Sequence, residues 1–260
     1  MPRDLSLRRG GDPGDRRRKE RPDRAVLPPA ALTIGPVANL LGVVAVLRSG
    51  ARRDAVPSDP LRLILWENIG YLIDDDRRQR LFETFEATVG FNPAAIIAAD
   101  GAALLAMAKQ GGMRPETRVE RWRTIARIVM EKCDGDLNAA LRALPLVKAR
   151  ALLKTFPVIG DPGADKVLLF SGVAGRPCLE SNGLRVLARL GLFAEQASYP
   201  ASYNAAITVL VNRGQADREW LMDAYLGLRE HGKTLCKRGE PNCVPCPLDS
   251  VCGHVAVAAL

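Results

Sequence analysis

Four cysteines near the C-terminus constrain this chain more than any other feature. They are spaced C-x6-C-x2-C-x5-C, at Cys236, Cys243, Cys246 and Cys252. Four thiolates in one short loop can bind a [4Fe–4S] cube, because each iron takes one sulfur ligand and the C-x2-C step brings neighbouring ligands to one corner. The spacing therefore predicts a loop that wraps this cluster.

Zinc and disulfide bonds are the alternatives for these cysteines. A structural zinc site usually has two close cysteine pairs, and here only Cys243 and Cys246 are close. Disulfides need an oxidising compartment, and the first apolar stretch follows a long charged tail with no secretory cleavage pattern. Cys133 and Cys178 stand alone, as small buried hydrophobes usually do. We expect all six cysteines to be reduced, in a cytoplasm.

Composition indicates a globular protein with a polyanionic partner. With 47% hydrophobic residues in 260, the chain can bury a substantial core, and it has no apolar run long enough to span a membrane. The net charge of +8 favours a polyanion. Residues 1–24 hold nine Lys and Arg against five Asp and Glu, which is +4 and half of that charge. We expect residues 1–26 to be a disordered basic tail.

After the predicted tail, the sequence shows one helical pattern after another. Residues 31–48 and 60–73 are apolar over most of a helical circumference, which predicts helices buried on several sides. Helical spacing and punctuation also mark residues 77–89, 93–99, 101–109, 116–132, 136–143, 147–155, 163–171, 183–190, 202–212 and 217–231. No alternating strand pattern competes with them, so the predicted fold class is all-α.

Residues 147–170 predict a tight helical hairpin. Two short amphipathic segments flank residues 156–160, where Gly160 supplies backbone freedom. Asp161 is a suitable N-cap, and Pro162 is a suitable first helical residue. Such a hairpin can present backbone N–H groups to a DNA phosphate, although a helical hairpin without a ligand would look similar.

Together with the cysteine loop, this hairpin makes the chain resemble the helix-hairpin-helix DNA glycosylases of the endonuclease III family, from about residue 60 to residue 252. Members carry L-P-G-V-G-R-K-T-A and later V-D-T-H-(x)2-R-V, where this chain has FPVIGDPGA at 156–164 and LESNGLRV at 179–186. The resemblance implies two helical domains. We assign residues 61–179 to a barrel with the hairpin, and residues 27–60 with 180–260 to an iron–sulfur domain.

Two departures from the family pattern bear on mechanism. Pro162 stands where the family has the lysine that forms a Schiff base, so strand cleavage by that route is lost. Lys166, one turn further on, is expected on an exposed face. Glu180, eighteen residues after Pro162, stands where the family has the aspartate that stabilises the positive sugar. Alternatively, Glu180 only favours the start of the following helix by its charge.

Glu67 is a second candidate catalytic residue. It lies inside the apolar segment 60–73, where an unpaired carboxylate would be costly. Its position matches the glutamate with which the related adenine-mismatch glycosylases protonate the departing base, a role that needs a raised pKa. Tyr71, one turn further on, could contact an extruded base. The alternative is a buried polar network that includes Asn68.

The resemblance also implies DNA-binding residues. The hairpin would hold a phosphate, with Asp161 weakening this grip because it replaces a usually basic residue. The other basic candidates flank the first cysteine, and solvated surface charge is the alternative for them. The predicted DNA-binding residues are Val158, Gly160, Gly163, Lys233, Lys237 and Arg238.

The sequence thus predicts a monofunctional DNA glycosylase of base-excision repair. It would cleave the N-glycosidic bond of a flipped damaged or mismatched base with Glu180, Glu67 and Tyr71, without lyase chemistry. The alternative is a catalytically silent relative that binds damaged or distorted DNA. We expect a monomer that binds double-stranded DNA in a bacterial cytoplasm, at the nucleoid and away from membranes.

Overall fold

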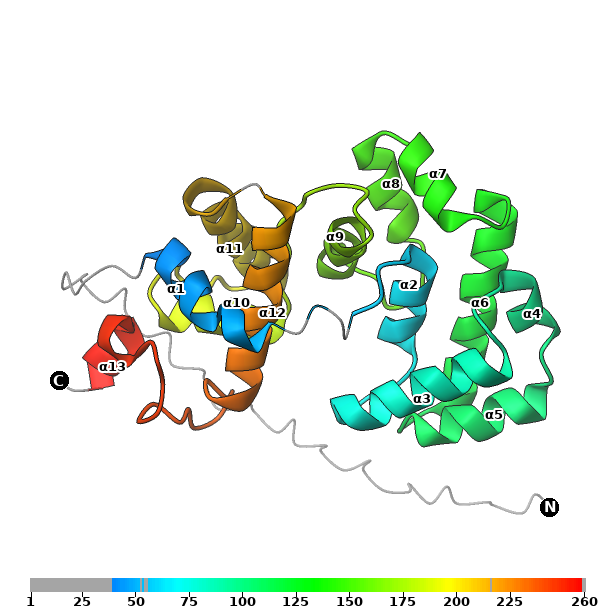
Figure 1. Ribbon diagram of the computed structural model, residues 1–260, viewed down its shortest axis with the longest axis horizontal. Helices are drawn as coiled ribbons and strands as arrows, with labels where there is room; N and C mark the ends of the chain where they lie inside the picture. Colours follow the sequence, from blue (N-terminus) through cyan, green and yellow to red (C-terminus); the bar gives the residue numbers. More distant parts are fainter. Residues whose placement is uncertain (1–38, 52, 54–55, 216, 259–260) are drawn as a thin grey trace, which may run out of the picture. The chain divides into compact units, whose positions relative to one another are not determined.

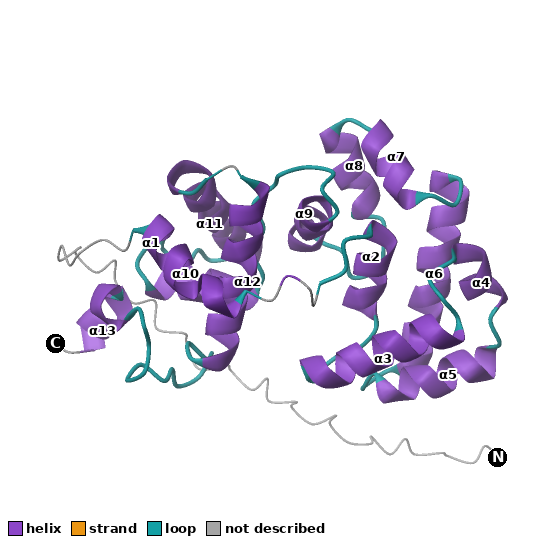
Figure 2. Ribbon diagram, in the orientation of Figure 1, coloured by secondary structure: helices purple, strands orange, loops and turns teal. Residues whose placement is uncertain are grey.

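The computed structural model describes residues 39–51, 53, 56–215 and 217–258 (Figure 1). The predicted tail at 1–26 and the first part of the predicted helix 31–48 lie outside these residues. The described residues form helices and loops, with no strand beyond one isolated backbone bridge (Figure 2). The all-α prediction is confirmed.

The helices lie close to the predicted ranges. Most bounds differ from prediction by one to three residues, and the last short helix is an addition that the pattern did not indicate. The helices are α1 (Leu40–Leu47), α2 (Pro60–Asn68), α3 (Asp75–Thr88), α4 (Pro93–Ala98), α5 (Gly101–Gln110), α6 (Pro115–Cys133), α7 (Leu137–Ala143), α8 (Leu146–Leu153), α9 (Asp161–Phe170), α10 (Ser181–Arg189), α11 (Tyr199–Arg213), α12 (Arg218–Thr234) and α13 (Gly253–Ala258), with 3-10 turns η1 (Arg48–Gly50) and η3 (Asp249–Val251).

Helix α2 forms for clear local reasons and ends earlier than predicted. The Asp59 side chain accepts the Arg62 N–H at 2.8 Å, and Pro60 occupies the first turn. The predicted helix 60–73 stops at Asn68, because the backbone beyond it turns to pair with another loop. The Tyr71 N–H donates to the Gly111 carbonyl at 2.9 Å.

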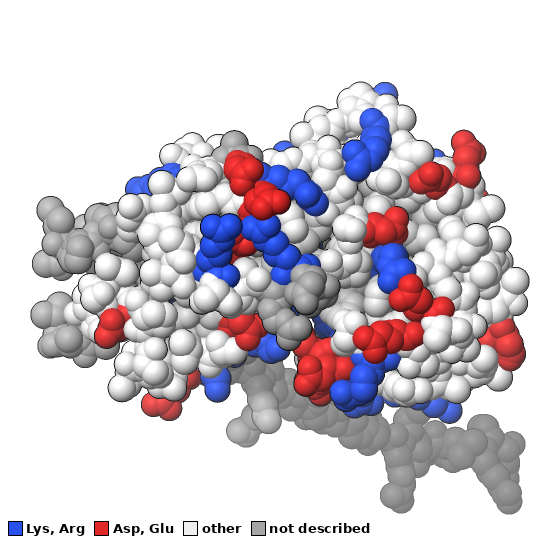
Figure 3. Space-filling view, in the orientation of Figure 1, with Lys and Arg blue, Asp and Glu red and all other residues white. Residues whose placement is uncertain are grey.

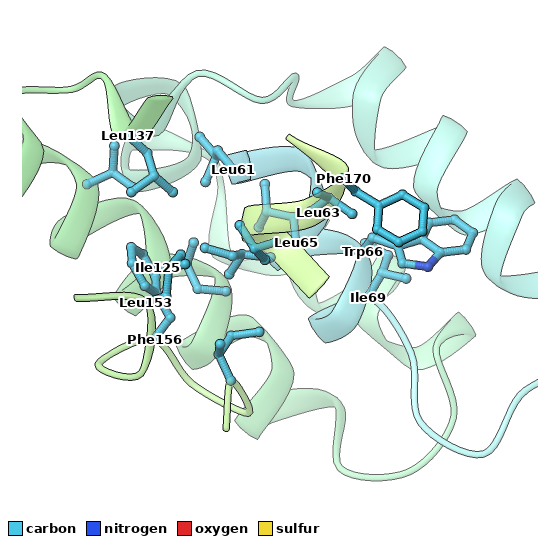
Figure 4. Close-up of a cluster of buried hydrophobic side chains, with 14 of the residues drawn as sticks. Leu61, Leu63, Leu65, Trp66, Ile69, Ile125, Leu137, Leu153, Phe156 and Phe170 are labelled. Carbon is cyan, nitrogen blue, oxygen red and sulfur yellow. The ribbon is translucent and has the colours of Figure 1, made fainter. Parts of the chain in front are cut away.

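Two clusters of buried hydrophobic side chains fill the described part of the chain. The first core is built from α2 to α9, and Figure 4 shows Leu63, Leu65 and Ile125 among its members. The second core is built mainly from α1, α10 and α11. Helix α12 contributes Leu221 and Tyr225 to the first core and Leu228 to the second. The predicted domain boundaries stay a prediction.

The surface charge is mixed. On the face in Figure 3, basic and acidic side chains lie next to each other. Several cations of the described residues are held by ion pairs, such as Arg53 with Asp223 at 2.7 Å and Arg62 with Glu86. None of the helices in the described ranges has the length and hydrophobicity needed to cross a membrane.

Candidate active site and cysteine loop

The hairpin between α8 and α9 is present, and its unusual backbone lies at Val158. Val158 has φ 68°, in the left-handed region, and its side chain is exposed. Gly160 has φ −92°, which any residue can adopt. The prediction that Gly160 supplies the turn's freedom is therefore wrong. The first glycine of the family motif, two residues before the one at Gly160, corresponds to Val158, so this chain has a β-branched residue where glycine would fit best.

Asp161 does not cap α9, contrary to prediction. Gly160 is the N-cap residue and makes no side-chain cap bond, while Asp161 is already in the helix. Its carboxylate pairs instead with Lys154 at 2.7 Å and Arg150 at 3.0 Å. The Lys154 hydrogen bond lowers the pKa of Asp161, although burial opposes this. Two cations next to the hairpin are thus neutralised within the protein.

The hairpin is tied to α2 and leaves free backbone donors. The Asn68 side-chain amide donates to the Pro157 carbonyl at 3.0 Å and to the Ile64 carbonyl at 2.9 Å. Near the turn, several N–H groups form no hydrogen bond with another described residue: those of Val158, Gly160, Asp161 and Gly163. The predicted Val158, Gly160 and Gly163 are therefore in a position to bind an anion through their backbone.

Lys166 is buried, which corrects the expectation of an exposed lysine. Its side chain is 8% exposed, and Nζ donates to Glu67 Oε1 at 2.6 Å. On another side, Nζ lies 5.3 Å from the Tyr225 ring centre and 5.9 Å from that of Phe170, within cation–π range. The apolar run that follows Lys166 could have indicated this burial, since it marks α9 as a helix buried on nearly all sides.

Glu67 is ionised more readily than an ordinary glutamate, so the predicted raised pKa is wrong. Burial raises the pKa of Glu67, but the Lys166 charge and hydrogen bond, with Arg78 and Arg229, outweigh it and lower the pKa. The side chain is 28% exposed. The burial that the prediction invoked does exist, but no local sequence pattern indicated the lysine that opposes its effect on the pKa. Glu67 is therefore an ionised carboxylate and not a protonated general acid.

Glu180 caps α10. Its Oε1 accepts the Gly183 N–H and its Oε2 accepts the Asn182 side-chain amide, both at 2.8 Å. The helix-stabilising alternative of the sequence analysis is therefore realised through hydrogen bonds. The same bonds also hold the carboxylate in one orientation, so the cap does not conflict with a catalytic role.

Tyr225 is a buried residue of α12 beside the Lys166–Glu67 pair, with its ring centre 5.3 Å from Lys166 Nζ. Burial raises the pKa of its hydroxyl well above the ordinary value, and the charges of Glu67 and Glu180 raise it further. The two carboxylates come from different elements, Glu67 from α2 and Glu180 from the N-cap of α10. Tyr225 was not predicted, because an aromatic residue in an amphipathic helix is indistinguishable by sequence from an ordinary core residue.

Tyr71 lies off the helix that was expected to carry it. It follows the end of α2, forms the isolated bridge with Gly112, and its side chain is 58% exposed. The helical spacing that related it to Glu67 is absent. Its role in the site stays a prediction.

The four C-terminal cysteines line one pocket. Cys236, Cys243, Cys246 and Cys252 share it with His231 and Leu248 among others. Burial, and then the charges of the other three cysteines, raise the pKa of Cys246, although a backbone hydrogen bond opposes them. No group of three or more His, Cys, Asp and Glu side chains in the described ranges could hold a single metal ion.

Helix α10 organises the first part of this loop. Arg189 Nη1 donates to the Lys237 carbonyl at 2.7 Å and lies 3.4 Å from Cys236 Sγ. Arg185 Nε donates to the Cys236 carbonyl at 3.0 Å. Four thiols lining one pocket, with Arg189 at the Cys236 sulfur and Arg185 at the Cys236 carbonyl, are the ligand type that an iron–sulfur cluster needs.

The predicted basic DNA contacts fall into two kinds. Lys237 and Arg238 have exposed side chains in the loop. Lys233 lies in the last turn of α12, and its Nζ pairs with Asp75 Oδ2 at 2.6 Å. Arg229 binds the same carboxylate at 3.0 Å. Lys233 is therefore already partnered, which the sequence pattern did not indicate.

Comparison with solved structures places this arrangement of helices among known folds. A thermostable thymine-DNA glycosylase matches with TM-score 0.67 and 16% identity over 84% of this chain and 95% of that chain. The chain has the helix-hairpin-helix glycosylase fold. A trapped endonuclease III–DNA covalent intermediate gives TM-score 0.68 and 17% identity, covering 85% and 96%. An H. pylori 3-methyladenine DNA glycosylase bound to 1,N6-ethenoadenine gives 0.58 and 12%, covering 75% and 98%.

At these identities the glycosylase fold is established, and activity is a separate question. No protein-family model and no curated protein matches the sequence. The fold nevertheless confirms the interpretation of the hairpin as part of a helix-hairpin-helix scaffold.

Proposed function

We propose that this chain is a DNA N-glycosylase of base-excision repair, which removes a flipped damaged or mismatched base by hydrolysis and leaves an abasic site. The observation that carries the proposal is a pair of carboxylates held by hydrogen bonds: Lys166 holds Glu67 at 2.6 Å, and Gly183 and Asn182 hold Glu180 at 2.8 Å. The solved structures that share the fold are named as DNA glycosylases, which supports the same class of reaction.

In the proposed reaction the two carboxylates have different tasks. Breaking the bond between sugar C1′ and the base builds positive charge on the sugar, which the fixed Glu180 carboxylate stabilises. Water adds its oxygen to C1′ and gives a proton to the Glu67 carboxylate. The bonding electron pair leaves with the base, which takes up a proton from solvent. Atoms and charge then balance.

The proposed enzyme is monofunctional. Pro162 has no amine, and the nearby Lys166 is engaged with Glu67 at 2.6 Å. A lysine that carries its proton in an ion pair offers no lone pair to the sugar. We therefore expect no strand cleavage through a Schiff base.

Duplex DNA is the proposed partner. The free N–H groups of the hairpin and the exposed Lys237 and Arg238 would bind backbone phosphates. Tyr71, exposed near the end of α2, would contact the displaced nucleotide. We also propose that the protein acts as a monomer in a bacterial cytoplasm, at the nucleoid.

The four loop cysteines would hold a [4Fe–4S] cluster, which when bound would cross-link the loop. Purified protein should contain iron and sulfide and show the visible absorbance of such a cluster. Cys246→Ala should lose these, whereas Cys133→Ala, which removes a buried thiol of the first core, should keep them. A colourless protein that contains zinc would contradict this assignment.

A lesion panel tests the activity. The protein is incubated with duplexes that carry different damaged or mismatched bases, and alkali then reveals abasic sites. We expect release of at least one base, with loss of release in Glu180→Gln and Glu67→Gln. Glu86→Gln is the control, because Glu86 is exposed and, among the described residues, forms an ion pair only with Arg62.

Each other outcome has a defined meaning. DNA binding without base release on the whole panel would support the catalytically silent relative instead. Strand cleavage without alkali, trapped as a covalent adduct by borohydride, would show that a lysine acts as nucleophile and would overturn the monofunctional assignment.

A further inference from the structure

The Lys166–Glu67 pair has an asymmetric environment. The lysine side chain is 8% exposed and the glutamate side chain 28%, so the cation is the inner partner and the carboxylate the outer one. Glu67 Oε1 accepts a hydrogen bond from Lys166 Nζ, while Oε2 forms no hydrogen bond with any described residue. One carboxylate oxygen is thus fixed and the other is left available.

Stability alone is a weak explanation for this pair. Burying an ammonium costs several kcal/mol, and hydrophobic replacements of buried ion pairs are often neutral or stabilising. The neighbours on α9 and α12 are aromatic, since the Phe170 and Tyr225 rings pack edge to face with centres 5.4 Å apart. These rings confine the ammonium, which leaves Glu67 as its only hydrogen-bond partner among the described residues.

The other groups that face Glu67 do not replace the lysine. Arg78 from α3 and Arg229 from α12 act on the carboxylate by charge alone, with no hydrogen bond between them and Glu67 among the described residues. Tyr225 and the thiol of Cys178 lie nearby, and burial raises the pKa of both, so they are neutral. Lys166 is therefore the group that sets both the charge and the orientation of Glu67.

We propose that Lys166 is the positioning residue of Glu67: its ammonium holds one carboxylate oxygen, so that the other faces the water that attacks the sugar. This inference rests on the proposed glycosylase function and adds a residue to its site. Lys166 forms no bond to DNA in this scheme. The Glu67 carboxylate accepts the proton of the attacking water, whose oxygen bonds to C1′ as the base departs.

Three variants test this role in the full chain. Lys166→Met removes the ammonium, Lys166→Gln keeps a donor without the charge, and Lys166→Arg keeps the charge. Arg62→Met is the matched control. It removes an ion pair between α2 and Glu86 and leaves the Lys166–Glu67 pair intact. Single-turnover base release and DNA affinity are measured across pH for each variant that circular dichroism shows to be folded.

We expect Lys166→Met and Lys166→Gln to lower the single-turnover rate about a hundredfold, as misplacement of a reacting group does, with unchanged DNA affinity. The acid limb of the pH profile should move to higher pH, because Glu67 loses the cation that keeps it ionised. Lys166→Arg should recover part of the rate, and the acid limb of its pH profile should lie at the wild-type pH. A purely structural role would lower thermal stability and leave the limb in place, which would overturn the proposal.

A second measurement does not depend on activity. The Glu67 carboxyl is titrated by ¹³C NMR in wild type and Lys166→Gln, with Glu67→Gln to assign the signal. A titration that moves to higher pH supports the positioning role, and an unchanged one refutes it. If wild type releases no base from the panel, the proposed function fails, while this titration still decides how Lys166 acts on Glu67. A borohydride adduct lost in Lys166→Arg would identify a nucleophile and refute the positioning role.

Discussion

Val158 has a backbone conformation that suits its side chain poorly. A β-branched residue in the left-handed region brings Cβ close to the following carbonyl, at a cost of about 1–2 kcal/mol. The turn is maintained by its neighbours, since Asn68 holds the Pro157 carbonyl and the Ile159 N–H donates to Phe156 at 3.2 Å. The strain lies at the hairpin that we propose to contact DNA.

We expect Val158→Gly to raise the free energy of unfolding by about 0.5–1 kcal/mol. Glycine relieves the strain, but it also gives the unfolded chain more freedom, which offsets part of the gain. Urea denaturation measures the change. Val158→Ala is the control, because it keeps Cβ and should recover little. A less stable glycine variant would show that the left-handed φ is not a source of strain.

Asp165 and Asp161 provide a matched pair of carboxylates on α9. Asp165 has a side chain 1% exposed and accepts Arg150, Arg176 and the Tyr203 hydroxyl at 2.7–3.1 Å. Asp161 also pairs with Arg150, but its side chain is 40% exposed. We expect Asp165→Asn to cost about 3 kcal/mol of unfolding free energy, and Asp161→Asn less than about 0.5 kcal/mol. Equal effects in chemical denaturation would contradict this dependence on burial.

At the level of single elements, α10 depends on the residue that we also place in the active site. Glu180 supplies its side-chain cap, and removing a cap costs about 1 kcal/mol. We expect this loss in Glu180→Ala and stability close to wild type in Glu180→Asp, because aspartate is a preferred cap. Thermal and urea unfolding of both variants check the expectation. Lost base release in a stable Glu180→Asp would separate catalysis from capping.

The elements also show what the sequence could predict. Cap residues and apolar spacing were sufficient for most helix bounds, as with Asp59, Pro60 and α2. The end of α2 was missed, because it depends on a loop more than forty residues away that pairs with Tyr71. The Lys166–Glu67 pair was missed for the same reason, since its partners are 99 residues apart. Local patterns predict local structure, and distant pairs decide charge states.

For the molecule as a whole, Asp75 links α3 to α12. Its carboxylate binds Arg229 and Lys233. Burial raises the pKa of Asp75, but these two cations outweigh it, so the pKa is below the ordinary value. A lowered pKa in the folded state contributes stability above the unfolded-state pKa, and this contribution is lost as pH falls through the folded-state value.

We therefore expect wild type to be more stable than Asp75→Asn at pH 7, and the difference to shrink below about pH 4. Urea denaturation at several pH values measures it. High salt should reduce the difference at pH 7, because the pair is partly exposed. Asp76→Asn is the control, since Asp76 forms no ion pair with a described residue. A difference that is constant with pH would contradict the assignment.

Helix α12 gives both cores buried side chains, and it comes late in the chain. Most of the first core, from Leu61 in α2 to Phe170 in α9, is synthesised before Leu221 and Tyr225. Until α12 has been synthesised, the apolar surfaces that Leu221 and Tyr225 cover in the first core and Leu228 covers in the second stay exposed on the nascent chain. During synthesis this protein should bind chaperones that recognise such surfaces until α12 has left the exit tunnel.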